Sequence, residues 1–166
     1  MLSVRCELSG GARRPRDPLR SGDAAFVPVG TPVRQVEGFD PAFRLAVEVD
    51  GGVRLYERSA PSEPGLGRDV FPGVAQHVRA VLLLSQRDGT TELARIDDAE
   101  EVARLLSELQ HAPYRPGRPF DADLFLGLLL DDGSTVRRAY DTRTGVLSPG
   151  LQLSGSFVGA ISAARP

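Results

Sequence analysis

The sequence contains no lysine and no tryptophan, and it has only one cysteine, Cys6, among its 166 residues. A single cysteine excludes an intrachain disulfide, and it also excludes a structural zinc site built from several thiolates. Because all 20 basic residues are arginine, the use of arginine at any one position says little about guanidinium chemistry there. The stability of this chain must therefore come from ordinary burial of apolar side chains.

Long apolar runs are also missing. No window reaches the length of about 18 apolar residues that a membrane-spanning helix needs, and residues 1–25 lack the apolar stretch of a secretory signal. Cys6 follows Arg5, whereas a lipidated cysteine normally follows a small residue. As written, the sequence predicts a soluble chain of the cytoplasm, and a signal missing from its N-terminus would instead place it outside the cytoplasm.

The charge is nearly balanced, with 20 basic and 22 acidic residues and a formal net charge of -2. Such a chain has no overall field that attracts nucleic acid or anionic lipid, so we expect neither partner. Residues 1–27 are rich in glycine, proline and arginine and predict a mobile leader. An alternative is that Arg13, Arg14 and Arg16 form a phosphate-seeking arm, but prolines interrupt the cluster and no aromatic residue accompanies it.

The composition, 41% hydrophobic and 25% charged, is typical of a globular protein. The apolar patterns predict an α+β fold, mainly an antiparallel sheet of three hairpins packed by one principal helix. We expect a single domain over residues 28–166, made of an N-terminal hairpin unit (31–58), a connecting loop (59–74) and a hairpin-helix-hairpin unit (75–166). The loop, SAPSEPGLGRDVFPGV, has too many prolines and glycines for a regular element.

The first hairpin follows from large apolar residues at every second position between Phe43 and Val49, after a shorter strand near 33–36. A three-residue loop, residues 50–52, sets Val49 opposite Val53 and brings the apolar faces of both strands together. A two-residue loop of Gly51 and Gly52 would set those faces in conflict. We therefore predict the three-residue loop.

The second hairpin covers residues 77–96 around Asp88-Gly89, and its first strand is apolar on both faces, as a central strand would be. The clearest helix follows, in IDDAEEVARLLSELQHAP, where Asp97 or Asp98 caps the start and Pro113 stops the end. Its apolar stripe, which we expect to pack on the sheet, consists of Val102, Leu105, Leu106 and Leu109.

The third hairpin is DLFLGLLLDDGSTVRRAYD, residues 123–141. A two-residue type I′ turn of Asp132 and Gly133 would set Leu129 opposite Val136, Phe125 opposite Tyr140 and Arg138 opposite Gly127. Asp132 then belongs to the turn, where aspartate tolerates positive φ, and Asp131 is a polar strand end, so neither residue carries a reaction. After this hairpin, the segment SFVGAISAA predicts a final short helix, with an edge strand as the alternative.

Several groups of residues could in principle support catalysis. The pairs Asp97/Asp98 and Asp131/Asp132 are better explained by helix capping and turn geometry than by acid-base work, because neighbouring side chains on a strand point to opposite faces. His77 could join a catalytic constellation on paper, but the motif of a nucleophilic serine is missing. A metal-dependent hydrolase using His111, Asp121 and Asp123 remains the alternative function. No nucleotide motif occurs, and we expect no cofactor.

The function that remains is a non-enzymatic binding or interaction domain. Arginine and tyrosine are enriched at interfaces, and a set of both kinds could gather near one end of the third hairpin. The candidate binding residues are Tyr114, Arg115, Arg137, Arg138, Tyr140 and Arg143. A protein or a small molecule is a possible partner, and the sequence leaves the oligomeric state open.

The order of elements over residues 77–163, with IDDAEEVARLLSELQ, FLGLLLDDGSTVRRAYD and a closing SFVGAI, resembles small extracytoplasmic domains of bacterial lipoproteins and receptor-like proteins. The resemblance covers a little over half of the chain and lies in the pattern of elements. It implies a domain that is not catalytic, and it assigns no functional residues. The chain departs from those proteins at its N-terminus, where it has neither a signal nor a lipobox.

Overall fold

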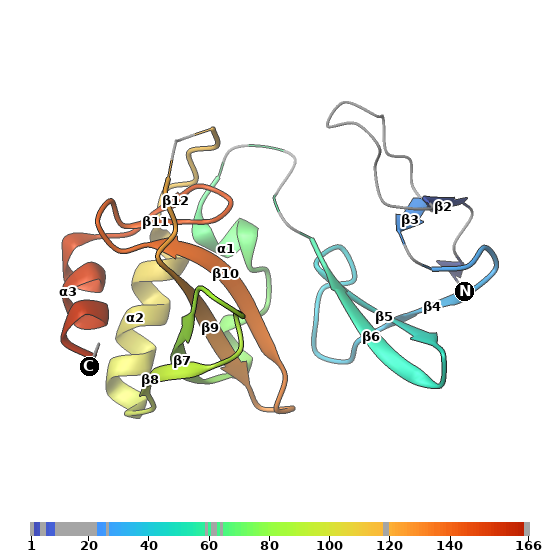
Figure 1. The fold of residues 1–166 in the computed structure, drawn as a ribbon, viewed down its shortest axis with the longest axis horizontal. Helices are drawn as coiled ribbons and strands as arrows, with labels where there is room; N and C mark the ends of the chain where they lie inside the picture. Colours follow the sequence, from blue (N-terminus) through green and yellow to red (C-terminus); the bar gives the residue numbers. More distant parts are fainter. Residues whose placement is uncertain are drawn as a thin grey trace. The chain divides into compact units, whose positions relative to one another are not determined.

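The computed structural model describes residues 2–3, 6–8, 23–25, 27–58, 60, 63, 65–117 and 120–164 (Figure 1). The chain divides into two compact units, residues 1–58 and 59–166. Antiparallel sheets dominate and helices accompany them in the second unit, which confirms the predicted α+β class. The sequence predicted one domain over 28–166. The boundary between the two units falls where that prediction placed the start of the loop.

The N-terminal unit has a four-stranded antiparallel sheet in the order β1-β4-β5-β6. Its strands are β1 (Leu2–Ser3), β4 (Pro32–Gln35), β5 (Arg44–Val49) and β6 (Gly52–Glu57). A separate parallel pair consists of β2 (Cys6–Leu8) and β3 (Asp23–Ala25).

Three of these strands lie within residues 1–27, which the sequence predicted to be a mobile leader. That prediction missed β1, β2 and β3, because strands of two or three residues are held by main-chain hydrogen bonds and leave no apolar periodicity. The arginine cluster at 13, 14 and 16 lies outside the described residues.

One face of the N-terminal sheet carries a small apolar core. Val27 and Val47 are buried, and Val33, Val49 and Tyr56 pack against them. The alternation of β5 therefore works as predicted, because Val47 and Val49 point to the same face.

The opposite face of this sheet holds a buried charge at one end. Arg44 is only 1% exposed, and its guanidinium lies 3.5 Å from the carboxylate of Glu57 and 4.8 Å from the ring centre of Phe39. An ion pair and a cation–π contact together offset part of the cost of removing this charge from water.

The β5–β6 hairpin differs from the prediction in its register. Val49 lies opposite Gly52, and the two-residue turn between them has positive φ at both Asp50 (56°) and Gly51 (74°), as in a type I′ turn. The predicted three-residue loop is therefore wrong. The shift of one residue moves the side chains of Val53 and Leu55 to the face opposite the small core.

The C-terminal unit is built on a six-stranded antiparallel sheet in the order β12-β11-β10-β9-β7-β8. The strands are β7 (Val78–Ser85), β8 (Glu92–Ile96), β9 (Leu124–Leu130), β10 (Thr135–Asp141), β11 (Val146–Leu147) and β12 (Leu151–Gln152). As predicted, β7 lies inside the sheet, between β9 and β8.

The helices of this unit are α1 (Gly67–Val70), α2 (Ala99–His111) and α3 (Gly155–Ala164), with a 3₁₀ turn at Ala75–His77. Asp98 caps α2 by accepting a 2.9 Å hydrogen bond from the Glu101 N–H. The predicted apolar stripe of α2 is buried, and the C-terminal segment is the helix that the sequence favoured. Both α2 and α3 lie on the same side of the sheet (Figure 1).

A short helix, α1, lies inside the loop 59–74, where the sequence predicted no regular element. The Gly67 N–H donates to the Ala112 carbonyl at the end of α2 (2.9 Å), and the Asp69 carboxylate accepts from the Leu66 N–H (2.8 Å). A Cβ at Gly67 would lie 1.7 Å from the Leu109 carbonyl oxygen. Only glycine permits this approach between α1 and α2, a tertiary contact that local composition does not reveal.

The third hairpin also has a register one residue away from the prediction. The Leu130 N–H donates to the Ser134 carbonyl (2.8 Å), which closes a three-residue loop over 131–133 with Gly133 at a φ of 81°. Arg137, and not Arg138, therefore lies opposite Gly127. The predicted type I′ turn is wrong because Asp131 lies in the loop together with Asp132 and Gly133.

Gly67→Ala should destabilise the C-terminal unit by about 3 kcal/mol, the upper end of ordinary overpacking, because the new methyl group meets main-chain atoms of α2. Gly159→Ala is the matched control. Gly159 lies in α3 with open space at its Cβ position. Because alanine favours the helix more than glycine does, this variant should raise the free energy of unfolding by up to about 1 kcal/mol. Urea unfolding measures both, and equal midpoints would contradict the close packing of α1.

Candidate interaction surface

The two tyrosines of the predicted binding set belong to the core. Tyr140 is 0% exposed and meets the ring of Phe157 edge-to-face at 6.5 Å, and Tyr114 is 9% exposed. Burial raises the pKa of the Tyr140 hydroxyl far above its ordinary value, with a contribution from the charges of Asp123 and Asp141. Neither ring is available to a partner at the surface.

The arginines of that set do not form one patch. Arg137 and Arg138 are neighbours on β10 and point to opposite faces of the sheet. Arg137 Nη1 donates to the Gly89 carbonyl (3.0 Å), whereas the Arg138 guanidinium lies 5.4 Å from the ring centre of Phe71. The two remaining members, Arg115 and Arg143, are exposed in other loops.

The acidic residues near the end of β10 hold loops in place. Asp141 is 1% exposed, and its carboxylate accepts hydrogen bonds from the N–H groups of Asp121 (3.1 Å), Arg143 (3.0 Å) and Thr144 (3.0 Å). Burial of this carboxyl opposes ionisation, but the hydrogen bonds outweigh it and lower its pKa. Asp123 likewise accepts from the N–H and hydroxyl of Thr142, at 2.8 and 2.7 Å.

The metal-site hypothesis of His111, Asp121 and Asp123 gains no support from this arrangement. His111 Nδ1 lies 2.7 Å from the Ser107 carbonyl of its own helix, and both oxygens of Asp123 accept from Thr142. Among the described residues, no three histidine, cysteine, aspartate or glutamate side chains are grouped so that they could hold a metal ion.

A pair that the sequence did not reveal joins His77 to Asp131. His77 Nδ1 lies 2.9 Å from Asp131 Oδ2, and the Asp131 N–H donates to the His77 carbonyl (2.8 Å). These residues flank the paired positions Val78 and Leu130, so the correct register of β7 and β9 would have revealed their proximity. The Asp131 side chain is 47% exposed, so the pair lies at the surface and fastens two strand ends.

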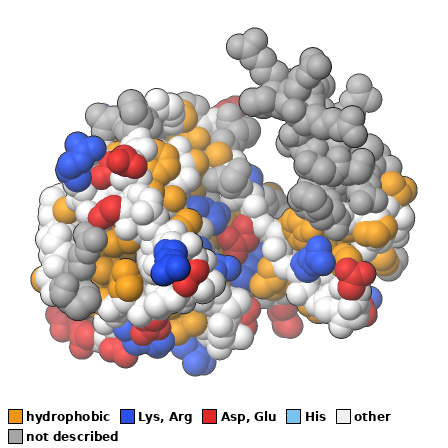
Figure 2. All heavy atoms as spheres, in the orientation of Figure 1, with side chains coloured by type: hydrophobic (Ala, Val, Ile, Leu, Met, Phe, Trp, Pro, Cys, Tyr) orange, Lys and Arg blue, Asp and Glu red, His pale blue; other side chains and the backbone are white. Residues whose placement is uncertain are grey.

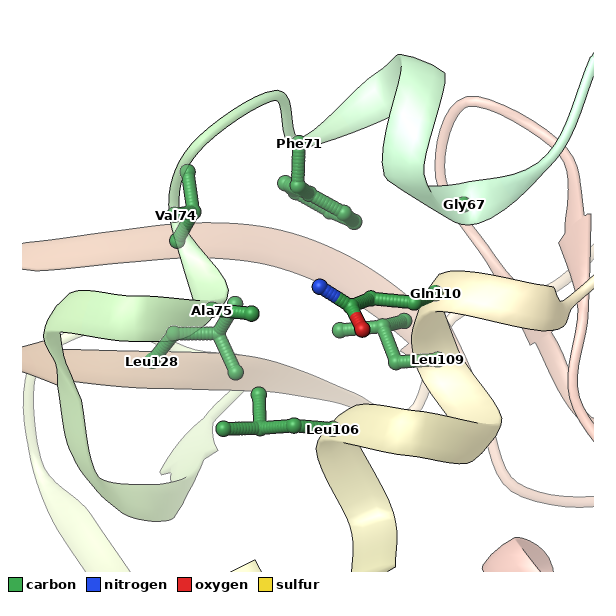
Figure 3. Close-up of a pocket in the computed structure, with 8 residues that line it drawn as sticks. All are labelled: Gly67, Phe71, Val74, Ala75, Leu106, Leu109, Gln110 and Leu128. Carbon is green, nitrogen blue, oxygen red and sulfur yellow. The ribbon is translucent and has the colours of Figure 1, made fainter. Parts of the chain in front are cut away.

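The C-terminal unit also has a shallow, mostly apolar hollow between α1, α2 and β9 (Figure 3). The amide of Gln110 points into it from α2, amid apolar side chains. Its volume, open mouth included, is about 210 Å³, below the roughly 300–1,000 Å³ of small-molecule pockets. It is lined by Gly67, Phe71, Val74, Ala75, Leu106, Leu109, Gln110 and Leu128.

The N-terminal unit exposes an apolar strip on β6. Val53 is 70% exposed and Leu55 is 41% exposed, and both point to the same face of the sheet as Ala46, which lies opposite Leu55. Figure 2 shows hydrophobic side chains at the surface of this unit, with single charged groups among them. The sequence missed this strip because the predicted register turned Val53 and Leu55 towards the core.

The same two residues direct their main-chain groups away from β5. The Arg58 N–H donates to the Phe43 carbonyl (2.8 Å). The main-chain N–H and C=O groups of every second residue before Arg58 in β6, including Arg54, therefore also point towards β5. Val53 and Leu55 alternate with these residues and direct their N–H and C=O groups to the outer side of β6. Within the described part of the chain, no strand pairs with that side.

Comparison of the chain with protein-family models, with curated proteins and with solved structures found no match. In the described part of the chain, no helix has the length and apolar character needed to cross a membrane. The function is therefore inferred from the geometry of the chain itself.

Asp131→Asn should flatten the acid limb of the stability curve. The hydrogen bond from His77 lowers the pKa of Asp131, so the pair contributes stability above the ordinary pKa of about 3.9, and that contribution disappears as the pH falls through the lowered pKa. Urea midpoints between about pH 5 and about pH 2 should fall less steeply than in the parent chain. His77→Gln should have the same effect, and the double variant no further one. Additive effects would show that the two side chains act separately.

Proposed function

We propose that this chain is a non-enzymatic binding domain that recognises a protein partner along the outer edge of β6. The observation that carries the proposal is the register of the β5–β6 hairpin. It gives Val53 and Leu55 exposed apolar side chains together with outward main-chain groups.

A strand edge of this kind suits an extended segment of another protein. Main-chain hydrogen bonds supply affinity in such strand addition, and alternate side chains supply specificity. Natural sheets usually protect their edges with charge or proline, but the outward positions Val53 and Leu55 carry neither. Burying each of these side chains is worth at most about 1.5–3 kcal/mol, since both are partly covered already.

Among the described residues, the hollow beside Gln110 gives a small-molecule site little support, because it is too small to enclose a typical ligand. Catalysis has less support as well. The carboxylates of Asp123 and Asp141 are engaged with loop N–H groups, and the His77–Asp131 pair lies at the surface. The resemblance to non-catalytic extracytoplasmic domains is in keeping with a binding role.

Peptides displayed on phage and selected on the immobilised full chain test the proposal. We expect enrichment of extended sequences with apolar residues at alternate positions, and at least a tenfold loss of their binding to Leu55→Thr, about 1.4 kcal/mol. Leu93→Thr is the matched control, because Leu93 on β8 is also 41% exposed. If the selected peptides bound Leu55→Thr and Leu93→Thr equally well, β6 would not be the binding site.

A further inference from the structure

We infer that the partner of the β6 edge is a second copy of this chain, joined in antiparallel fashion about a two-fold axis at Leu55. This inference rests on the proposed function and names its partner. The sequence of β6 complements itself when two copies pair in this way.

Two-fold symmetry restricts how two β6 strands can pair. Antiparallel strands of one sheet are related by an axis perpendicular to the sheet, so each face of one copy continues as the same face of the other. The side chains of residues directly opposite each other must then point to the same face of the joined sheet. Because adjacent residues of a strand point to opposite faces, the axis passes through one residue of each strand and not between two. Near the middle of β6, that residue is Arg54, Leu55 or Tyr56.

Charge selects among these registers. A pairing centred on Arg54 sets two arginines directly opposite each other, and one centred on Tyr56 sets Arg54 opposite Arg58, also a like-charge pair. The pairing centred on Leu55 avoids both, because Arg54 then lies opposite Tyr56 of the second copy and Val53 lies opposite Glu57. An arginine beside a tyrosine ring is a favourable contact.

The main chain and the side chains agree with the Leu55-centred register. Leu55 directs its N–H and C=O groups outward, so two copies of Leu55 form a hydrogen-bonded pair across the axis. Their side chains meet on the exposed face, with Val53 of each copy on the same face of the joined sheet. One strand pair buries little surface, so the dimer should be weak and should form only at high protein concentration.

Cysteine cross-linking tests the register. In a Cys6→Ser background of the full chain, Leu55→Cys places two thiols at a Cα separation of about 5.5 Å, within the range for a disulfide. Val53→Cys places its two copies about 13 Å apart along the strands, and Arg54→Cys places them beyond about 7 Å and on the other face. We expect the Leu55→Cys variant to form a covalent dimer at least tenfold faster than the other two.

Leu93→Cys in the same background measures how fast disulfides form by random collision, because Leu93 is as exposed as Leu55. Cross-linking of Leu55→Cys no faster than Leu93→Cys would overturn the inference, as would fastest cross-linking at Arg54→Cys. Sedimentation velocity of the parent chain should show a concentration-dependent dimer that Leu55→Pro abolishes, because proline removes an outward N–H and no bond to β5. Circular dichroism checks that each variant is folded.

A chain that stays monomeric at every concentration would overturn the second copy as the partner. If peptides selected on the chain still required Leu55, the binding edge itself would stand. If the chain stayed monomeric and the selected peptides did not require Leu55, the proposed function and the dimer would both be wrong.

Discussion

The register of the β5–β6 hairpin is the constraint on which the surface of the N-terminal unit depends. Its two-residue turn requires positive φ at Asp50 and Gly51, and glycine and aspartate are the residues that tolerate such backbone angles. Once the turn is fixed, each side chain of β6 is assigned to a face. Val53 and Leu55 therefore lie exposed on a sheet whose other face holds the small apolar core.

The C-terminal unit uses its polar residues differently. Its carboxylates are engaged in capping: Asp98 starts α2, and Asp141 binds three N–H groups of neighbouring loops. Each of these contacts satisfies main-chain donors that would otherwise lose their hydrogen bonds on burial. Asp98 and Asp123, which the sequence offered as candidates for catalysis or metal binding, thus cap a helix and hold a loop.

The two hairpin errors have one cause. The loops DGG and DDG each allow a two-residue and a three-residue solution, and composition alone does not separate them. The prediction chose the longer loop for the first hairpin and the shorter loop for the third, and each choice was off by one residue. The error at the first hairpin hid the exposed strip. The prediction assumed that the apolar side chains of both strands point to the same face of the sheet, whereas Val53 and Leu55 point to the face opposite the small core.

The sequence by itself determined the elements that depend on local periodicity and end signals. The cap and stripe of α2, the central position of β7 and the α+β class all follow from patterns within a few residues. Only the tertiary structure decided register, the α1–α2 contact at Gly67 and the pairing of His77 with Asp131. These features join residues far apart in the chain, and their energies depend on packing and main-chain geometry that no single segment contains.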